Sequence, residues 1–353
     1  MTKTDYCGAH IPVMLDAVLA ALAPRDGETI VDATFGAGGY SRAILTSADC
    51  RVIGLDRDPR AIAAASAHTD TFGGRLSLVE TPFAKMDDAL GTDKTGSIDG
   101  IVFDLGVSSM QLDEADRGFS FRLEGPLSMR MDGARPDASD VVNVASANDL
   151  RLIFKAYGEE KRAGKLADAI IVARDAAPIT TTRRLADIIA AASPPVYAGA
   201  GRKSRQKSGP RTIHPATRVF QALRIFVNDE LGQLAEGLCA AEKLLKPSGR
   251  LVVVTFHSLE ARIVKRFFAD RTVGLETRSR HAPALNVPPA TFTVPNRGQE
   301  AASRAEADDN PRARSASLRW GRRTSLPARE TGLGFAGLPN LSFSPELLRL
   351  KDS

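Results

Sequence analysis

The chain has 353 residues, of which 43% are hydrophobic and 25% charged, with a formal net charge of +5 at pH 7. This length allows a full hydrophobic core and about two domains. The longest apolar runs, such as 251–256, are far shorter than the roughly 20 residues of a membrane helix, which excludes a membrane-embedded protein. The three cysteines (Cys7, Cys50 and Cys239) are too far apart for a disulfide framework or a zinc site. With no secretory signal visible, we expect a cytoplasmic protein without a metal or a membrane partner.

Short strand-like runs alternate with helical segments in the first third of the chain. The runs cover 29–34, 51–56, 76–80 and 98–105, and segments such as Pro59–Ala67 lie between them. This alternation is typical of βαβ units and predicts an α/β fold with a mostly parallel sheet.

The strand pattern stops after Val107 for about a hundred residues. Helical spacing in 147–156, 161–175 and 182–192 predicts an inserted helical domain. The following segment, 198–218, contains six basic residues and no acid: Arg202, Lys203, Arg205, Lys207, Arg211 and Arg218. Two interpretations remain open for this basic loop, a solvated insert or a loop that contacts phosphates.

Strand character returns at 250–256, after one amphipathic helix whose apolar residues run from Val219 to Leu238. Residues 316–320 predict a last strand, and the residues after Thr324 a flexible tail. The sheet would then be built from two separated parts of the chain. We therefore predict a discontinuous domain of 1–109 and 211–323, an inserted substrate-recognition domain of 110–210 and a tail of 324–353.

A glycine-rich turn follows the first predicted strand and opens a helix. Its pattern is Gly36-x-Gly38-Gly39, and Asp56 ends the next strand, where an acid can bind the ribose hydroxyls of an adenosine. Both NAD and S-adenosylmethionine satisfy this pattern. Ser41 departs from the small third residue of the dinucleotide motif. Asp32 would repel a pyrophosphate but could hold the ammonium group of a methionine moiety.

Three further residues follow predicted strands, and each has a structural alternative. Phe83 could pack on an adenine face or belong to the core. Asp104 ends the fourth strand, at the edge where α/β folds bind ligands, but it could also cap the next turn. His257 could contact a base or a phosphate, or it could simply precede a helix that Ser258 caps and whose first turn holds Glu260.

Several blocks of the chain strongly resemble the RsmH (MraW) family. They include HIPVML (His10–Leu15), DATFGAGGYSRAIL, GLDRDPRAI, DLGVSSMQLD, HPATRVFQALRIFVNDEL and RLVVVTFHSLEARIVKRF (Arg250–Phe267). The resemblance runs from about His10 to Arg319. It implies a Rossmann-like class I methyltransferase that uses S-adenosylmethionine to methylate the N4 amine of one cytosine in the decoding region of 16S rRNA. The implied partner is the small ribosomal subunit, with no obligate protein partner.

The resemblance also assigns site residues. The family's cofactor contacts correspond to Gly38, Gly39, Tyr40, Asp56, Phe83, Asp104 and Gln111. Tyr40 stands where the family commonly has His, so only a contact through the backbone carries over there. Ser128 and Ala261 replace family acids outside the cofactor positions.

The chemistry of the implied reaction adds further candidates. Methylation of an amine needs a hydrogen-bond acceptor, for which we name Asp104 as the catalytic candidate, with the carbonyls of Leu105 and Gly106 as alternatives. His214, Arg218 and His257 are candidates for RNA contacts. None of the cysteines is well placed as the nucleophile that methylation at cytosine C5 would require.

Overall fold

A computed structural model describes residues 12–66, 69–134, 136–193, 214–272, 289–295, 299–329 and 332–351. The chain forms two compact units, each made of two stretches of sequence. The sheet unit comprises Met1–Ser108 and Leu231–Leu338, and the helical unit comprises Ser109–Glu230 and Pro339–Ser353. These bounds differ from those of the predicted domain of 1–109 and 211–323 and of the predicted insertion of 110–210.

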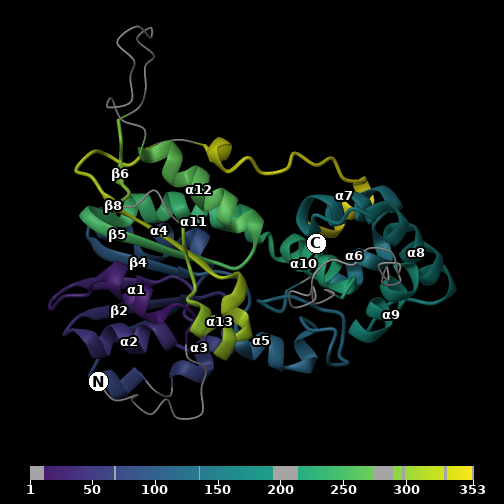
Figure 1. Cartoon of the computed structure of the whole chain (residues 1–353), viewed down its shortest axis with the longest axis horizontal. Coiled ribbons are helices and arrows are strands. Elements are labelled where there is room, and N and C mark those ends of the chain that lie inside the picture. Colours follow the sequence, from purple (N-terminus) through teal and green to yellow (C-terminus); the bar gives the residue numbers. More distant parts are fainter. Residues whose placement is uncertain are drawn as a thin grey trace, which may run out of the picture. The chain divides into compact units, whose positions relative to one another are not determined.

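The sheet unit is built on one mixed sheet with the strand order β3-β2-β1-β4-β5-β8-β6, and β7 pairs with β8 (Figure 1). The strands from β1 to β5 run parallel, and β8 is antiparallel to β5. This arrangement is a Rossmann-like α/β fold, as the strand pattern predicted. The strand bounds are β1 Thr29–Asp32, β2 Arg51–Asp56, β3 Leu76–Glu80, β4 Ile98–Asp104, β5 Leu245–Thr255, β6 Phe292–Thr293, β7 Glu300–Ala301 and β8 Ser317–Arg323.

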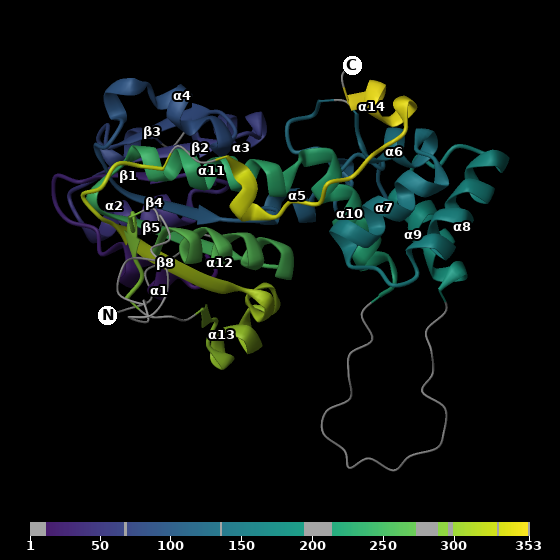
Figure 2. The same cartoon turned by 90° about the horizontal axis from the view of Figure 1, so that it is seen from above.

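Helices cover both faces of the sheet (Figures 1 and 2). The central strand β4 is buried from Ile98 to Phe103, as expected of a parallel strand covered on both sides. The helices of this unit are α1 Leu15–Leu22, α2 Gly39–Ser47, α3 Pro59–Ser66, α4 Met86–Leu90, α11 Glu230–Leu244, α12 Ser258–Thr272 and α13 Arg304–Asp309. Short 3₁₀ turns are η1 Thr69–Phe72, η2 Phe83–Lys85, η3 Thr92–Lys94, η6 Pro311–Ser315 and η7 Leu333–Ala336.

The helical unit confirms the predicted helices of the insertion. Its elements are α5 Ser109–Asp113, η4 Ala115–Arg117, α6 Ala138–Val144, α7 Ala147–Gly158, α8 Ala163–Ala176, α9 Thr182–Ala192, α10 Ala216–Asn228 and α14 Pro345–Lys351. Capping boxes begin α6 at Asp137 and α7 at Ser146. Among the described residues, no helix has the length and apolar character needed to span a lipid bilayer.

The prediction of one continuous helix from Val219 to Leu238 is wrong. The chain leaves the helical conformation at Asp229, whose φ is +49°, and this residue ends α10 before α11 begins. The apolar spacing continues through the break because both helices bury that side, so periodicity alone could not reveal it. Helix α10 belongs to the helical unit, where it packs against α7, instead of to the predicted domain of 211–323.

The residues after Thr324 also differ from the predicted flexible tail. Arg329 pairs with Asp270 at 2.9 Å, and the Phe343 ring packs on Phe226 with 5.2 Å between centroids. The Ser344 N–H donates to Asp149. These contacts use single residues scattered along the segment, and such scattered contacts produce no periodic signal in the sequence.

Candidate functional site

The glycine turn after β1 is held by backbone contacts to the neighbouring strand. The Phe35 N–H donates to the Leu55 carbonyl, and the Gly36 N–H donates to Asp56 Oδ2, both at 2.8 Å. Gly36 and Gly38 have φ values of +53° and +73°, which favour glycine. A Cβ atom on Gly38 would lie 2.6 Å from the Phe35 ring, so this turn also needs glycine for its own packing.

Asp32, at the end of β1, is 1% exposed and is engaged by the same turn. Its Oδ2 accepts the Ser41 hydroxyl at 2.7 Å, and its Oδ1 accepts the Thr34 N–H at 3.3 Å. Burial raises the pKa of Asp32 to about 6, although the Ser41 hydrogen bond opposes the shift. The structure therefore supports a role for Asp32 in anchoring β1 to α2, and it explains the serine that departs from the dinucleotide motif.

Asp56 ends β2 in an orientation set by two backbone donors. Oδ2 accepts the Gly36 N–H and Oδ1 accepts the Asp58 N–H, each at 2.8 Å. Burial raises the pKa of Asp56, and these hydrogen bonds partly offset the rise. Each oxygen keeps a second lone pair, so the fixed carboxylate can still accept hydrogen bonds from a vicinal diol.

Asp104, at the end of β4, differs because part of its carboxyl group lacks a partner. Its N–H donates to the Thr34 hydroxyl at 2.6 Å, whereas Oδ1 is buried and accepts no hydrogen bond. Burial, followed by the negative charges of Asp32 and Glu260, raises the pKa of Asp104 well above its usual range. An uncompensated buried acceptor of this kind would be satisfied by a donor or a cation on a ligand.

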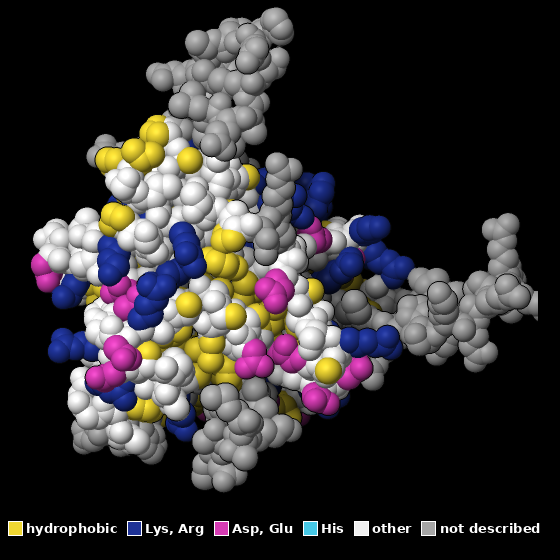
Figure 3. Space-filling model, turned by 60° about the vertical axis from the view of Figure 1, so that its left-hand side comes forward, with side chains coloured by type: hydrophobic (Ala, Val, Ile, Leu, Met, Phe, Trp, Pro, Cys, Tyr) yellow, Lys and Arg dark blue, Asp and Glu magenta, His cyan; other side chains and the backbone are white. Residues whose placement is uncertain are grey.

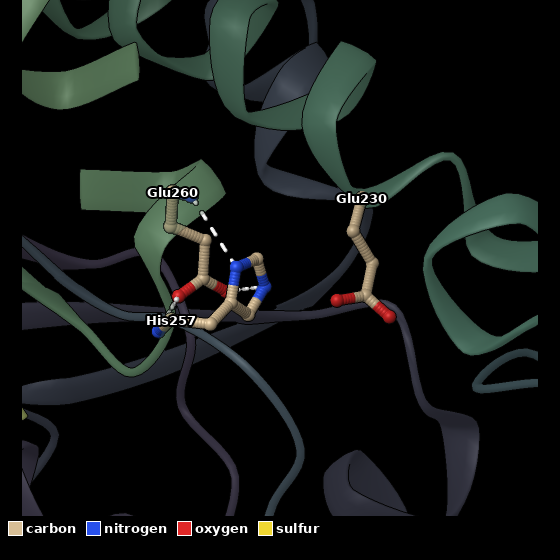
Figure 4. A group of neighbouring side chains, drawn as sticks. All are labelled: Glu230, His257 and Glu260. Carbon is tan, nitrogen blue, oxygen red and sulfur yellow. Dashed lines mark hydrogen bonds and ion pairs between the residues drawn. The ribbon is translucent and has the colours of Figure 1, made fainter. Parts of the chain in front are cut away.

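His257 and Glu260 form a reciprocal arrangement between β5 and α12 (Figure 4). Glu260, 2% exposed, accepts the N–H groups of Phe256 and His257 through Oε2, at 2.8 and 3.2 Å. The Glu260 N–H reaches His257 Nδ1 at 3.4 Å, and His257 Nε2 lies 3.1 Å from Glu260 Oε1. Glu260 thus accepts the backbone N–H groups of the two residues before α12. Its place in the first turn agrees with the structural alternative, although Ser258, the predicted cap, is the first residue of the helix.

The remaining predicted residues are spread over both units. Phe83 is half-buried and meets Phe103 edge to face at 5.4 Å, while the buried Tyr40 donates its hydroxyl to the Val13 carbonyl. Gln111 is buried on α5 of the helical unit. His214 stacks on Phe121 in that unit with 4.7 Å between ring centroids.

Other functional candidates were only partly visible in the sequence. Thr34 was missed, although its hydroxyl joins β1 to β4 beside Asp104. Its signal was a polar residue between the strand and the glycines. Glu230, also drawn in Figure 4, begins α11 and forms a bidentate ion pair with Arg224 at 2.7 Å. We therefore assign no metal to the group of Glu230, His257 and Glu260. The basic residues between 202 and 211 lie outside the described residues.

The carboxyl edge of the sheet therefore gathers acidic side chains. Asp32, Asp56 and Asp104 end three adjacent strands, and Glu260 follows a fourth. A pyrophosphate would be repelled here, whereas a ligand that carries a sulfonium and an ammonium group would be attracted. Because Asp104 Oδ1 also needs a partner, the residues fit S-adenosylmethionine better than NAD.

Comparison with known proteins agrees with this site. The model of the MraW methylase family matches residues 8–324. Ribosomal RNA small subunit methyltransferase H of Rhizobium leguminosarum bv. trifolii is 54% identical over 343 residues, covering 96% of both chains. The protein of the same name from Sinorhizobium fredii is 55% identical over 333 residues, covering 94% of this chain and 93% of its own. The chain belongs to the MraW methylase family.

Proposed function

We propose that this protein transfers a methyl group from S-adenosylmethionine to the N4 amine of a specific cytosine in the decoding region of 16S rRNA, within the small ribosomal subunit and in the cytoplasm. The observation that carries the rRNA substrate is the 54% identity, over 96% of the chain, to a ribosomal RNA small subunit methyltransferase. The choice of the N4 amine rests on the motif resemblance and on the chemistry of the available side chains.

S-adenosylmethionine, when bound, supplies a methyl group activated by the sulfonium. The chain's own part is to bind and orient. Asp56, fixed by the N–H groups of Gly36 and Asp58, accepts the ribose hydroxyls. The helical start at Gly39 lets the backbone approach the cofactor closely. Phe83 on η2 offers a half-buried ring for the adenine. Gln111 stays a predicted contact.

The target amine needs an acceptor because its lone pair is delocalised into the cytosine ring. Asp104 Oδ1, buried without a hydrogen bond, is the side-chain candidate, and the carbonyls of Leu105 and Gly106 follow it directly. A hydrogen bond from the amine to one of these oxygens favours the pyramidal nitrogen that attacks the methyl group. The carboxylate form of Asp104 would be favoured by the positive charge of a bound S-adenosylmethionine, and a carboxylate whose pKa is raised is a stronger base for the proton that the amine must lose.

Methylation at cytosine C5 would instead require a thiolate beside the cofactor. Cys50 is buried just before β2, at the opposite end of that strand from Asp56. Cys239 lies within α11 and contacts Arg271. Burial raises the pKa of both thiols, which disfavours the reactive form. The cysteines of the described residues thus favour amine methylation, and Cys7 lies outside them.

Mass mapping of small-subunit rRNA from cells with and without this gene tests the proposal. We expect one cytosine in the decoding region to lose a methyl group that fragmentation places on N4. Loss of a C5 methyl group, or no change, would contradict the assignment. Calorimetry with S-adenosylhomocysteine and with NAD checks the cofactor separately, and preferential NAD binding would contradict it. Cofactor binding without methyl transfer to small subunits would instead favour an assembly factor.

A further inference from the structure

Positively charged side chains gather where α7 ends, α8 begins and α10 begins in the helical unit. We call this surface the basic corner and define it by six exposed side chains: Arg151, Lys155, Lys161, Arg162, Lys165 and Arg218. Contacts between its elements place them together. Arg151 lies beside Gly164 of α8, and Arg218 reaches the Glu159 carbonyl at the end of α7.

The lysines of the basic corner are uncompensated. Lys155, Lys161 and Lys165 form no ion pair among the residues that the structure describes. The neighbouring Glu160 offers little neutralisation to them, because its Oε1 accepts the Arg162 N–H and its Oε2 lies 4.0 Å from Arg218. The other nearby acids are Glu159, at the end of α7, and Asp168, three residues after Lys165 on α8, and within the described part of the chain the three lysines form an ion pair with neither of them.

Several of these cations are placed where they cost the helices stability, although Lys155 lies in the last turn of α7, where the helix dipole favours a cation. Arg151 and Lys155 are four residues apart on α7, and Lys161 and Lys165 have the same spacing around the start of α8, so both are like-charge pairs. Helix α8 has no acid in its first turn and no side-chain cap, although cations surround its positive end. Both α6 and α7 begin with capping boxes, so the same unit caps other helices fully.

The face shown in Figure 3 has a different charge pattern, since its Lys and Arg side chains are interspersed with Asp and Glu. Interspersed charges need no external partner. The basic corner, by contrast, repels itself until an anion with many charges binds, and a phosphate backbone provides such charges at regular spacing.

We propose that the basic corner is a docking surface for the phosphate backbone of folded rRNA, formed by α7, α8 and α10 independently of the basic loop. This proposal rests on the proposed rRNA substrate and identifies the protein surface that would bind the RNA backbone. Phosphate contacts position an RNA without reading its sequence, so the corner sets the affinity for the subunit and leaves the choice of base to the cofactor site.

The test is the triple variant Lys155→Gln, Lys161→Gln, Lys165→Gln. All three side chains are exposed, so the fold should persist, and the melting temperature should stay equal or rise because repulsion is removed. We expect KM for small subunits to rise about tenfold or more at low salt, with unchanged kcat and cofactor affinity. A plot of the logarithm of the subunit-binding constant against the logarithm of the salt concentration should become less steep by about 2. Each lost phosphate contact lowers this slope by roughly 0.7–0.9.

The matched control removes three cations from the sheet unit, Arg25→Gln, Arg51→Gln and Lys94→Gln. Arg25 precedes β1, Arg51 begins β2 and Lys94 precedes β4. We expect this control to keep the wild-type KM, and the variant Lys155→Arg, Lys161→Arg, Lys165→Arg should also preserve binding. An equal loss in the control would reduce the effect to net charge and overturn the proposal. An unchanged KM in the glutamine variant would overturn it too.

Binding to protein-free 16S rRNA identifies the partner. The glutamine variant should bind this RNA more weakly than the wild type does. Wild-type affinity for the free RNA, combined with lost subunit binding, would point to an acidic ribosomal protein and overturn the proposal. Failure of the proposed function would look different, because the wild-type protein would then transfer no methyl group to rRNA.

Discussion

At the scale of single residues, the three strand-end aspartates differ in how their oxygens are satisfied. Asp32 is bonded to Ser41 and Asp56 to two backbone N–H groups, whereas Asp104 Oδ1 has no partner. A buried acceptor left unsatisfied in the folded protein costs stability. Its presence at the ligand edge of an α/β sheet is the expected sign of a group that waits for a substrate or a cofactor.

We predict that Asp56→Ala weakens binding of S-adenosylmethionine by about 1–3 kcal/mol, because two ribose hydroxyls lose a charged acceptor. Calorimetry on the purified variant measures this loss. Asp56→Asn is the control for shape and should lose less, since its amide oxygen still accepts one hydrogen bond. A dissociation constant equal to that of the wild type in Asp56→Ala would remove Asp56 from the site.

Asp104→Asn should separate stability from activity. Because its pKa is raised, the Asp104 carboxyl stays protonated in the folded protein at pH values where it is already ionised in the unfolded chain. The free energy of unfolding therefore falls as pH rises from about 4, the ordinary pKa of Asp, towards the raised pKa. An uncharged amide removes that penalty, and we expect a higher melting temperature at neutral pH. Methyl transfer at saturating cofactor should fall by about 100-fold or more if Asp104 orients the amine. A change in cofactor affinity alone would restrict Asp104 to binding.

At the scale of elements, the turn between β1 and α2 is fixed from both sides. Backbone bonds join it to β2, and the Ser41 hydroxyl joins α2 to the end of β1. The break at Asp229 similarly separates α10 from α11 and so separates the two units along the chain. In both places a local contact determines where an element begins or ends.

We predict that Ser41→Ala destabilises the protein by about 1–3 kcal/mol, because the buried Asp32 loses its hydroxyl donor. The loss should depend on pH. The pKa of Asp32 is about 6, so below it the neutral carboxyl tolerates the change better, and above it the charged carboxylate suffers the full loss. Thermal melts at pH 5 and pH 8 measure the difference. A loss independent of pH would contradict this role of the hydroxyl.

At the scale of the whole molecule, the chain passes between the two units three times, after Ser108, Glu230 and Leu338. The last passage carries Phe343 and Ser344 into contacts with α10 and α7. Each unit therefore contains residues from distant parts of the sequence. Neither unit corresponds to one continuous segment that could be excised intact.

We predict that the protein methylates an assembled or nearly assembled small subunit much better than naked 16S rRNA. A stacked cytosine must leave its stack to reach the methyl group, which costs a few kcal/mol unless the surrounding structure already presents it. Methyl-transfer rates on both substrates, measured across a salt series, test this, and activity should fall as salt rises. Equal rates on both substrates would exclude the claim.

The basic loop has its own variant, in which Arg202, Lys203, Arg205 and Lys207 are neutralised together. This variant should weaken subunit binding and flatten the salt dependence while cofactor affinity stays unchanged. A salt slope like that of the wild type would exclude the loop from RNA binding, and the basic corner would be tested independently by its own lysines.

The sequence by itself determined the parallel part of the sheet and predicted where the cofactor binds. Strand period, the glycine turn and the acid after β2 are local patterns, since each depends on neighbours within a few residues. The parallel strands from β1 to β4 and the helices α7, α8 and α9 were therefore predicted close to their observed bounds, whereas β5 begins at Leu245, ahead of the predicted 250–256. The family motifs added the methylase identity, which the match over residues 8–324 shows.

Only the tertiary structure decided which polar groups have hydrogen-bond or charge partners. The bond from Ser41 to Asp32, the unpartnered oxygen of Asp104 and the packing of Phe343 on Phe226 each join residues whose distance in space the sequence does not encode. The same holds for the basic corner, where cations from α7, α8 and α10 meet because those helices pack together. Hydrogen bonding and charge compensation depend on distances of a few ångströms, and folding alone sets those distances.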